Sequence, residues 1–454
     1  MTLNCCDNKL LGFAYINLDS RDSMVMFPEE IWEEIFKKID DVADLIKLQS
    51  VCVSFNKWIR RLLERDVNWK KRCQAISDQG HYEIFTKVYP NLINEIDSSW
   101  KNDIDNRDWR KIFMSWKKWN FSLNREVFID SIYDFPTFSR NEVITCIDVW
   151  GDIVGTTTSE GLIYFCKTYE PGKIIYRADH KAEVRQIKFW YTGNELLAVT
   201  CSIYEKIKFW NVFERKEIDT NNCFGGRILS INRNCCYLTY NNYLIRTKYC
   251  AVNKLIIPDS VSTTLLSPHE EIIATYSSDE FTSIITNEKS VISRYVINTT
   301  NTEYEDDDFS IELDNDLENA VVKKFYALSP NVMVGLCDHL MAVSIDNKPW
   351  KVYNVFKHFL SIVTAIIYHA NILILGFDSG YVALFRLNNL QDLLDFNFTT
   401  QFSKKIKVDG QPIISLNVTD IQDEQFIIST SEKNFHVIRF FKSTCDVTKI
   451  ERKV

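Results

Sequence analysis

The chain has 454 residues, of which 46% are hydrophobic and 25% charged, and its formal net charge is −8. This length predicts two or three domains, and the apolar content excludes a chain that is disordered throughout. With 53 basic and 61 acidic side chains, the composition lacks the basic surplus of a non-specific nucleic-acid binder. The low counts of glycine (13) and proline (9) exclude collagen-like and proline-rich architectures.

No stretch of the sequence approaches the ~18 uncharged apolar residues of a membrane span. The first residues also lack the basic-then-apolar order of a signal peptide. The 13 cysteines form no CxxC pair and lie mostly in apolar runs such as VCVSF, which argues against zinc and thioredoxin-type sites. We therefore expect a protein of the cytoplasm, the nucleus or both, with no membrane or nucleic-acid partner.

The apolar pattern changes near residue 120. Before it, apolar residues recur every three or four positions, and seven of the 11 tryptophans lie there, which predicts helices. The first strong segment, at 27–69, starts at Pro28 and carries an apolar stripe that includes Ile31 and Ile35. Three short helices are expected there, the second of them capped by Asp41 or Asp44. Such a segment is too small to bury its own apolar residues, so we expect a partner to cover part of it.

A further helix is predicted in DWRKIFMSWKKWN, where Trp109, Ile112, Phe113 and Trp116 follow the spacing of one buried face. Residues 1–120 contain 19 basic and 19 acidic side chains. This balance favours a solvated packing helix over one that binds membranes or nucleic acid.

After residue 120 the apolar residues alternate in short runs, which is typical of strands. The runs recur in units of about 43 residues, the length of one propeller blade. An early strand-like run, REVFIDSIY from Arg125, is expected to supply the outer strand of the last unit. Six or eight units fit the spacing too, and a two-sheet sandwich or two smaller β-domains is the alternative. The units begin near Val143, His180, Phe224, Val261, Val321, Ser361 and Ile413.

The helical segment resembles the F-box family. The matching positions include Phe27-Pro28, where the family usually has Leu-Pro, and Val51-Cys52 followed by Phe55, Trp58 and Trp69. An F-box implies docking to the Skp adaptor and through it to a cullin. Phe36, Phe55 and Trp58 could equally form the segment's own core, and a helical hairpin that packs on its own chain is the alternative. By the resemblance, the adaptor contacts are Phe27, Pro28, Ile31, Leu45, Leu48, Val51 and Cys52.

The second repeated unit resembles a WD repeat. Asp179-His180 opens it and Phe209-Trp210 closes its third strand, but Tyr204 stands where the family has Asp, so the family's His–Asp pair is incomplete. An F-box followed by WD repeats resembles the F-box/WD-repeat substrate receptors of ubiquitin ligases. The resemblance implies that protein substrates bind the loops at one end of the propeller, with arginines pairing to any phosphate groups. The candidate residues are Arg177, Arg185, Arg215, Arg227 and Arg246.

An acidic segment, NTEYEDDDFSIELDNDLE, interrupts the repeats. It contains nine acidic and no basic residues, and its spacing does not match a calcium-binding loop. We expect a solvated loop inserted at about 299–318 between the fourth and fifth units, with a docking strip for a basic partner as the alternative.

No catalytic motif is present in the sequence. None of the seven histidines has a partner at metal-ligand spacing, and the nucleophile, metalloprotease and nucleotide-binding motifs are missing. We therefore expect a non-enzyme with no cofactor or metal, which acts on substrates through a complex that it joins. A catalytic site inside the propeller is the weakest hypothesis, because no polar cluster can be nominated for it.

The predicted fold is α+β and multidomain, with all-α F-box and linker helices followed by an all-β propeller of seven blades. The domains are a tail at 1–25, an F-box at 26–72, a helical linker at 73–122, the propeller at 123–445 and a tail at 446–454. The expected function is substrate recognition in a Skp–cullin–F-box ubiquitin ligase. The alternative is a non-degradative scaffold that binds the Skp adaptor or other proteins.

Overall fold

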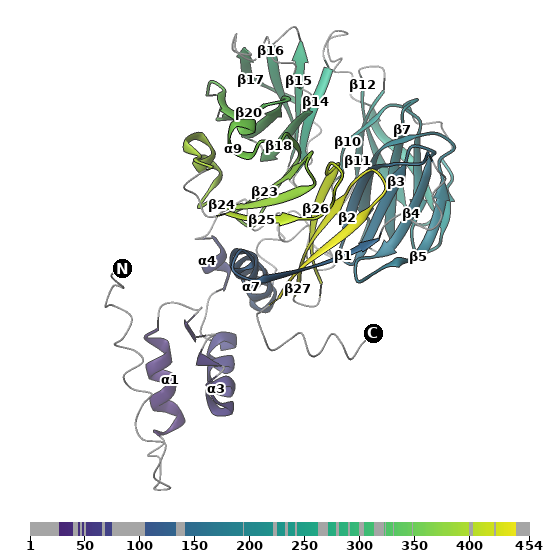
Figure 1. Ribbon diagram of the computed structural model, residues 1–454. Helices are drawn as coiled ribbons and strands as arrows, with labels where there is room; N and C mark the ends of the chain where they lie inside the picture. Colours follow the sequence, from purple (N-terminus) through teal and green to yellow (C-terminus); the bar gives the residue numbers. More distant parts are fainter. Residues whose placement is uncertain are drawn as a thin grey trace. The chain divides into compact units, whose positions relative to one another are not determined.

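The computed structural model describes the chain in two compact units, 1–68 and 69–454 (Figure 1). Both predicted tails lie outside the described residues, as does most of the first half of the predicted linker. The described residues are 27–39, 44–45, 48–49, 51–65, 69–74, 105–132, 141–193, 195–220, 225–231, 235–240, 243–261, 271–277, 281–288, 291–298, 304–312, 322, 324–329, 331–346, 348–398, 403–421 and 424–441.

The first unit contains two well-defined helices, α1 (Glu29–Lys37) and α3 (Val53–Arg65), which pack against each other. Helix α1 begins directly after Pro28, has acidic residues in its first turn and ends with a basic one, as the helix dipole favours. The second short helix that we predicted lies largely outside the described residues. The helical character of this segment is thus confirmed over α1 and α3.

In the second unit, α4 (Trp69–Gln74) packs on α7 (Asn106–Ser122). The carboxylate of Asp105 accepts the backbone N–H of Arg107 at 3.3 Å and caps α7. Trp109, Ile112 and Phe113 are buried, which confirms the predicted apolar face of this helix at these three positions, and Trp116, its fourth predicted member, is half-buried.

The rest of the second unit is mostly β. Within the described residues it forms seven four-stranded antiparallel sheets, each with neighbouring strands consecutive in the chain except the last. The first sheet contains β2 (Ile144–Trp150), β3 (Ile153–Thr158), β4 (Leu162–Lys167) and β5 (Glu170–Asp179). The second contains β6 (Val184–Tyr191), β7 (Leu196–Ser202), β8 (Ile207–Asn211) and β9 (Lys216–Ile218). The third contains β10 (Arg227–Ile231), β11 (Cys236–Tyr240), β12 (Tyr243–Cys250) and β13 (Leu255–Val261).

The fourth sheet contains β14 (Glu271–Ser277), β15 (Phe281–Glu288), β16 (Val291–Asn298) and β17 (Tyr304–Glu312). The fifth contains β18 (Lys324–Ser329), β19 (Val332–Leu336), β20 (Leu340–Ile345) and β21 (Lys351–Asn354). The sixth contains β22 (Val363–His369), β23 (Ile372–Phe377), β24 (Tyr381–Arg386) and β25 (Ser403–Lys407). A short helix, α9 (Val355–Phe359), follows β21, and a 3-10 helix at Leu390–Asp395 follows β24.

The last sheet joins the two ends of the β-rich region. It contains β26 (Ser415–Ile421), β27 (Glu424–Thr430), β28 (Phe435–Phe441) and, on the outside, β1 (Glu126–Ile132). Strand β1 pairs antiparallel with β28, from Glu126 opposite Phe441 to Ile132 opposite Phe435. This pairing confirms the prediction that the run after Arg125 supplies the outer strand of the last unit.

The first strands of successive sheets contact each other in turn: β2 with β6, then β10, β14, β18, β22 and β26, and β26 also contacts β2. The main apolar cores lie between neighbouring sheets. One of them joins Ile163 and Phe165 of β4 to Ile187 of β6, and another joins Val154 of β3 to Ile428 of β27. The β2–β5 sheet therefore buries apolar residues on both faces, which explains its many apolar runs.

The expected loop at about 299–318 is wrong in its central part. Residues 304–312 form β17, which pairs with β16, and three residues, Asp307 to Phe309, lie opposite the single residue Arg294 in a bulge. The run of charged residues suggested a loop. The outermost strand of a sheet is hydrogen-bonded on one side only, however, and therefore tolerates charged residues.

Helix α7 meets the sheets at a buried carboxylate, Asp420, at the end of β26. Ser115 Oγ and Trp119 Nε1 of α7 both donate to it, the indole at 2.7 Å. Trp119 is fully buried, and its ring packs edge-on against that of His369 with 5.0 Å between centroids. Burial raises the pKa of Asp420 to about 6, although the two hydrogen bonds from α7 oppose this shift.

The last turn of α7 and the residues after it extend this junction. Asn120 Nδ2 donates to the carbonyl of Ala370 at 3.2 Å, and Arg125 Nη1 donates to Gln425 Oε1 at 2.6 Å. Ala370 and Gln425 belong to the β22–β23 turn and the start of β27, so α7 lies at the end of the sheets where their first strands finish.

Candidate functional site

An exposed apolar ridge at α1 is formed by Phe27, Ile31 and Ile35. Ile31 and Ile35 are four residues apart and share one side of the helix, whereas Phe27 precedes the helix and its ring lies 5.9 Å from that of Trp32. Phe27, Ile31 and Ile35 are 50%, 46% and 41% exposed. Val51 (63%), just before α3, and Val53 (87%), its first residue, are exposed as well. A soluble surface rarely leaves apolar side chains grouped in this way, and the ridge has the character of a protein-docking surface.

The other side of α1 packs on α3 through aromatic rings. The ring of Phe55 lies 4.7 Å from Trp32 and 5.1 Å from Phe36, measured between centroids. Phe36 and Trp58 are buried, so these residues form the segment's own core, which was one of the two roles considered for them. Helix α1 is therefore apolar on both sides, and among the described residues only its inner side is packed against another helix.

The residues predicted to contact the adaptor do not all lie at the surface. Leu48 is half-buried, and Leu45, at 2% exposed, is a core residue rather than a surface contact. A helix as short as the one expected around Leu45 presents two apolar sides, and spacing alone does not say which side is covered. Ile35 and Val53 were missed, although the spacing of four from Ile31 pointed to Ile35. The exposed predicted residues are Phe27, Pro28, Ile31, Val51 and Cys52.

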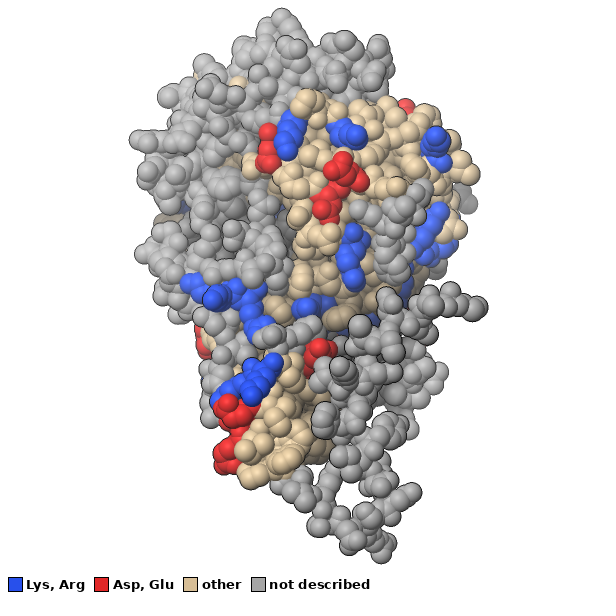
Figure 2. All heavy atoms as spheres, turned by 90° about the vertical axis from the view of Figure 1, so that its left-hand side faces the viewer, with Lys and Arg blue, Asp and Glu red and all other residues tan. Residues whose placement is uncertain are grey.

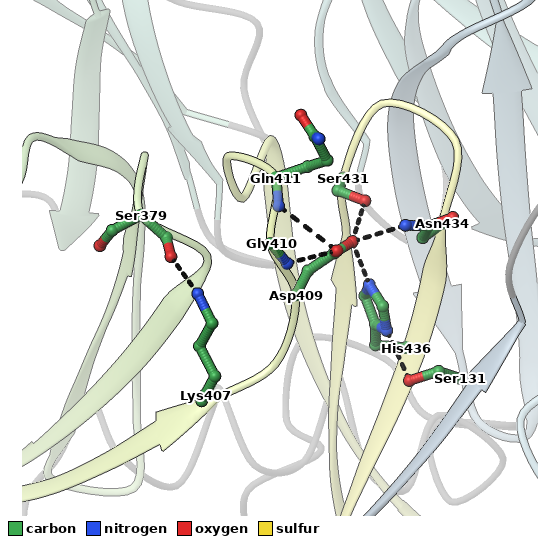
Figure 3. Close-up of polar contacts among 9 residues, drawn as sticks. All are labelled: Ser131, Ser379, Lys407, Asp409, Gly410, Gln411, Ser431, Asn434 and His436. Carbon is green, nitrogen blue, oxygen red and sulfur yellow. Dashed lines mark hydrogen bonds and ion pairs between the residues drawn. The ribbon is translucent and has the colours of Figure 1, made fainter.

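A polar cluster that the sequence did not indicate lies where the β25–β26 connection meets the last sheet (Figure 3). One carboxylate oxygen of Asp409 accepts hydrogen bonds from Ser431 Oγ at 2.5 Å, Asn434 Nδ2 at 2.8 Å and His436 Nε2 at 2.9 Å. The other oxygen accepts the backbone N–H groups of the turn that follows, with Gly410 at 2.6 Å. Asp409 therefore ties its own loop to β27 and β28.

The ring of His436 continues this cluster to β1, where its Nδ1 lies 2.7 Å from Ser131 Oγ. Because the carboxylate of Asp409 can only accept, Nε2 carries the proton and Nδ1 accepts from the Ser131 hydroxyl. Ser131, His436 and Asp409 are hydrogen-bonded in the order found in a Ser-His-Asp catalytic triad, but the His436 side chain is fully buried. Without access for a substrate, the arrangement serves as a clamp between strands.

Asp409 should make stability pH-dependent in acid. Burial raises the pKa of Asp409, but its hydrogen bonds together hold the pKa well below the usual 3.8. A depressed folded-state pKa adds stability that is present above about pH 4 and lost as the pH falls. We expect Asp409→Asn to lower the free energy of unfolding by about 2 kcal/mol at pH 7.

Urea unfolding of wild type and Asp409→Asn at pH 7, 4 and 3 would measure this effect. The difference between the two proteins should shrink below pH 4. Ser131→Ala, which removes only the outer hydrogen bond of the cluster, should cost about 1 kcal/mol at each pH. An equal loss at every pH for Asp409→Asn would contradict the prediction.

His180, predicted to open the second unit, has a structural role. It is 1% exposed, and its backbone N–H donates to the carbonyl of Gly161 at 2.8 Å. Burial lowers the pKa of His180 to about 4, so the ring is neutral at pH 7. In the same sheet Trp210 Nε1 donates to Thr200 Oγ1 at 2.8 Å, while the side chain of Tyr204 is 78% exposed.

Two of the five predicted arginines lie together. Arg185 is the second residue of β6 and Arg227 the first of β10, and both are exposed. The side chain of Gln186 accepts the backbone N–H of Ile228 at 3.0 Å and joins these two strand ends. Because β6 and β10 both start at this end, the arginines lie at the opposite end of the sheets from α7.

The other three predicted arginines do not join this pair. Arg215 lies in the β8–β9 turn, at the opposite end of the sheet from Arg185. Arg177 lies on the outermost strand β5 with its guanidinium 5.8 Å from the ring of Tyr164, and Arg246 is half-buried in the middle of β12. Because the repeated units differ in strand length, the sequence alone does not show at which end of a sheet a given arginine lies.

No protein-family model matches the chain, and no curated protein matches it either. Two solved structures are similar over about two thirds of its length, each at 11% identity. A computationally designed protein, Ika8, has a TM-score of 0.40 over 66% of this chain and 97% of its own. Sqt1 of Saccharomyces cerevisiae has a TM-score of 0.47 over 67% of this chain and 98% of its own. Both scores are below 0.5, and neither similarity assigns a fold or a function.

Among the helices in the part of the chain that the structure describes, none combines the length and apolar character needed to cross a membrane. No group of three or more His, Cys, Asp or Glu side chains there is placed to hold a metal ion.

Proposed function

We propose that the chain is the substrate-recognition subunit of a Skp–cullin–F-box ubiquitin ligase. The observation that carries this proposal is the exposed ridge of Phe27, Ile31 and Ile35, on a helix whose other side is already packed. A helix that is apolar on both sides needs a second partner, and the spacing of these residues resembles that of the F-box. The partner is then the Skp adaptor, and through it a cullin.

The β-rich region, in this proposal, is a closed seven-bladed propeller of divergent WD repeats. Seven four-stranded sheets, the succession of contacts between their first strands, and the pairing of β1 with β28 support it. Closure would leave β2 and β26 as neighbours and no open end to the succession of sheets.

The proposed mechanism is positioning, not chemistry. The helical segment would attach the chain to the ligase, and the propeller would hold a protein substrate near the ubiquitin-charged enzyme, which raises its local concentration. Substrates would bind the end of the sheets opposite α7, where Arg185 and Arg227 lie. The chain itself would supply no catalytic residue or cofactor, and it would act in the cytoplasm, the nucleus or both.

The ridge offers a direct test. We expect Ile31→Glu to weaken binding of the Skp adaptor by about 30-fold or more, because it buries a charge at the centre of an apolar contact. Phe213→Glu is the matched control, since Phe213 is a 58% exposed aromatic residue in the β8–β9 turn. Co-expression with the adaptor followed by size-exclusion chromatography would compare the two variants with the wild type.

Co-elution of wild type and Phe213→Glu, but not of Ile31→Glu, would support the docking surface. Absence of any complex between the folded wild type and the adaptor would overturn the proposal. The alternative, a non-degradative scaffold, also binds the adaptor. Recovery of the cullin and ubiquitination of a captured substrate distinguish the ligase subunit from the scaffold.

A further inference from the structure

Two lysines of β25 share one aromatic ring. Lys405 and Lys407 are two residues apart on a strand without a bulge, so they project from the same face of the sheet, and Tyr381 lies directly opposite Lys407. Their ammonium groups lie 4.3 Å and 4.6 Å from the centroid of the Tyr381 ring. Lys407 Nζ also donates to the carbonyl of Ser379 at 2.6 Å (Figure 3). The ring and this carbonyl hold two positive charges close together.

These two charges are not neutralised by the described part of the chain. Both lysine side chains are exposed, and neither forms an ion pair with a described residue. In the adjoining turns, the carboxylate of Asp378 accepts hydrogen bonds from its own loop, and that of Asp409 belongs to the cluster described above. Because like charges at short distance repel, an anion bound to both ammonium groups would relieve this repulsion.

An exposed leucine lies beside the two lysines. Leu360 directly follows α9, has a φ of +50° and is 78% exposed. Leucine is strained in this left-handed conformation, in which glycine most often ends a helix. The hydroxyl of the next residue, Ser361, lies 2.5 Å from that of Ser379, whose carbonyl binds Lys407. Backbone strain and an apolar side chain in water are both unfavourable for folding, which points to a binding role for this leucine.

These residues lie at the end of the sheets opposite α7. Strand β22 finishes near α7, so the α9–β22 connection, the start of β24 and the end of β25 all lie at the other end. Figure 2 shows the left-hand side of Figure 1, on which α9, β24 and β25 lie, and a band of Lys and Arg side chains crosses the middle of this face. We call the surface the lysine corner, and it consists of Leu360, Tyr381, Lys405 and Lys407.

The chemistry of the lysine corner fits an acidic protein segment in an extended conformation. Alternate residues of an extended chain lie about 6.6 Å apart on one face, which is also the repeat that separates Lys405 from Lys407. Acidic residues at alternate positions can therefore pair with both ammonium groups, while an apolar neighbour contacts Leu360. A nucleic acid or an anionic membrane would face a much larger area of the chain, whose net charge of −8 opposes such a contact.

We propose that the lysine corner docks an extended acidic protein segment, with acidic residues at alternate positions and an apolar residue beside them. This inference deepens the proposed function, and it rests on that function only in naming the partner a ubiquitination substrate. The docking itself needs neither the adaptor nor the cullin, so the two proposals can fail separately.

Fluorescence anisotropy of a labelled peptide with the full chain would test the proposal. The probe is a short peptide in which glutamate alternates with serine and which ends in a single leucine. We expect a dissociation constant below about 100 μM at about 20 mM salt, and weaker binding as added salt screens the charges. The same peptide with glutamine in place of each glutamate should bind about tenfold more weakly or worse.

Variants of the chain separate the charges from the leucine. Lys405→Glu/Lys407→Glu should weaken binding of the glutamate peptide by about tenfold or more, because attraction becomes repulsion. Lys173→Glu/Lys216→Glu, at exposed positions of β5 and β9, changes the net charge equally and should bind like the wild type. Leu360→Gly should weaken binding about threefold. Its midpoint of urea unfolding should be unchanged or higher, since glycine suits a positive φ. A lower midpoint with unchanged binding would overturn the role of the leucine.

The adaptor variant provides the control between the two proposals. Ile31→Glu should bind the peptide like the wild type, whether or not the wild type binds the adaptor. Absence of saturable binding by the folded wild type at about 100 μM, or equal binding of the glutamine peptide, would overturn the proposal. Binding of phosphatidylserine vesicles in place of the peptide, lost in Lys405→Glu/Lys407→Glu, would overturn it as well and assign the corner to a membrane.

Discussion

Replacing Asp420 by alanine should lower the free energy of unfolding of the β-rich unit by about 3 kcal/mol at pH 4. The substitution leaves Ser115 Oγ and Trp119 Nε1 buried without their acceptor, and each unsatisfied polar group costs about 1–3 kcal/mol. At pH 7 the loss should be smaller, because the buried charged carboxylate is itself unfavourable, as its raised pKa indicates. Urea unfolding followed by tryptophan fluorescence would measure the change, with Trp119 as a reporter of the α7 junction.

The matched variant Asp420→Asn separates the hydrogen bonds from the charge. The amide oxygen can accept from Trp119, and the amide nitrogen can donate to the Ser115 hydroxyl, so stability should change by less than about 1 kcal/mol near pH 4. In the wild type, a pKa of about 6 in the folded state against 3.8 in the unfolded state means that stability is lost as the pH rises through this interval. The loss amounts to about 3 kcal/mol.

The free energy of unfolding of Asp420→Asn, relative to that of the wild type, should therefore increase between pH 4 and pH 7. Lys118 and Arg125 are the nearby cations that moderate the effect. The opposite result, a wild type that gains on Asp420→Asn as the pH rises, would show that the carboxylate is stabilised in its charged form. The pH dependence of stability due to Asp409 falls below pH 4 and has the opposite sign, so the effects of the two carboxylates on stability can be measured separately.

Features set by neighbours in the sequence were predictable. Helix α7 followed from apolar residues spaced by three and four, and the strands followed from short alternating runs between turns. The pairing of β1 with β28, although distant in the chain, was predicted because an apolar strand without a sheet has to pair somewhere. The apolar ridge on α1 was predicted in the same way, from a helix with more apolar residues than one side can bury.

Features that depend on distant partners were not predictable. Ser115 and Asp420 are 305 residues apart, as are Ser131 and His436, and nothing in the local sequence marks any of these residues as paired. The burial of Leu45 and the position of Arg215 depend on how elements pack and on which end of a sheet a turn occupies. Strand β17 was missed for the reverse reason, because its local charge pattern is that of a loop.

Two glycines lie at turn positions where the backbone conformation favours glycine and where the next connection packs closely. Gly161 and Gly380 lie in the equivalent turns before β4 and β24, both with positive φ (+89° and +72°). Each accepts a backbone hydrogen bond from the connection to the next sheet, His180 N–H in one case and Val408 N–H in the other. The same turn geometry thus recurs in two sheets and brings the next connection against the turn.

Gly380→Ala should therefore be strongly destabilising, by about 3 kcal/mol or more. An L side chain at this φ costs about 1–2 kcal/mol, and a Cβ would lie 2.7 Å from the carbonyl carbon of Asp409 and 2.8 Å from the oxygen of Gln411. Both atoms belong to the backbone of the loop that holds the Asp409 cluster, so relief of the clash would pull Asp409 away from Ser431 and His436.

Gly410→Ala is the control in the same loop, because a Cβ there meets nothing within 4 Å. It should change the unfolding free energy by less than about 1 kcal/mol. If Gly380→Ala acts through the Asp409 loop, combining it with Asp409→Asn should cost less than the sum of the two single changes, since both disturb the same contacts. Additive losses in this double-mutant cycle would instead confine the effect of Gly380 to its own turn.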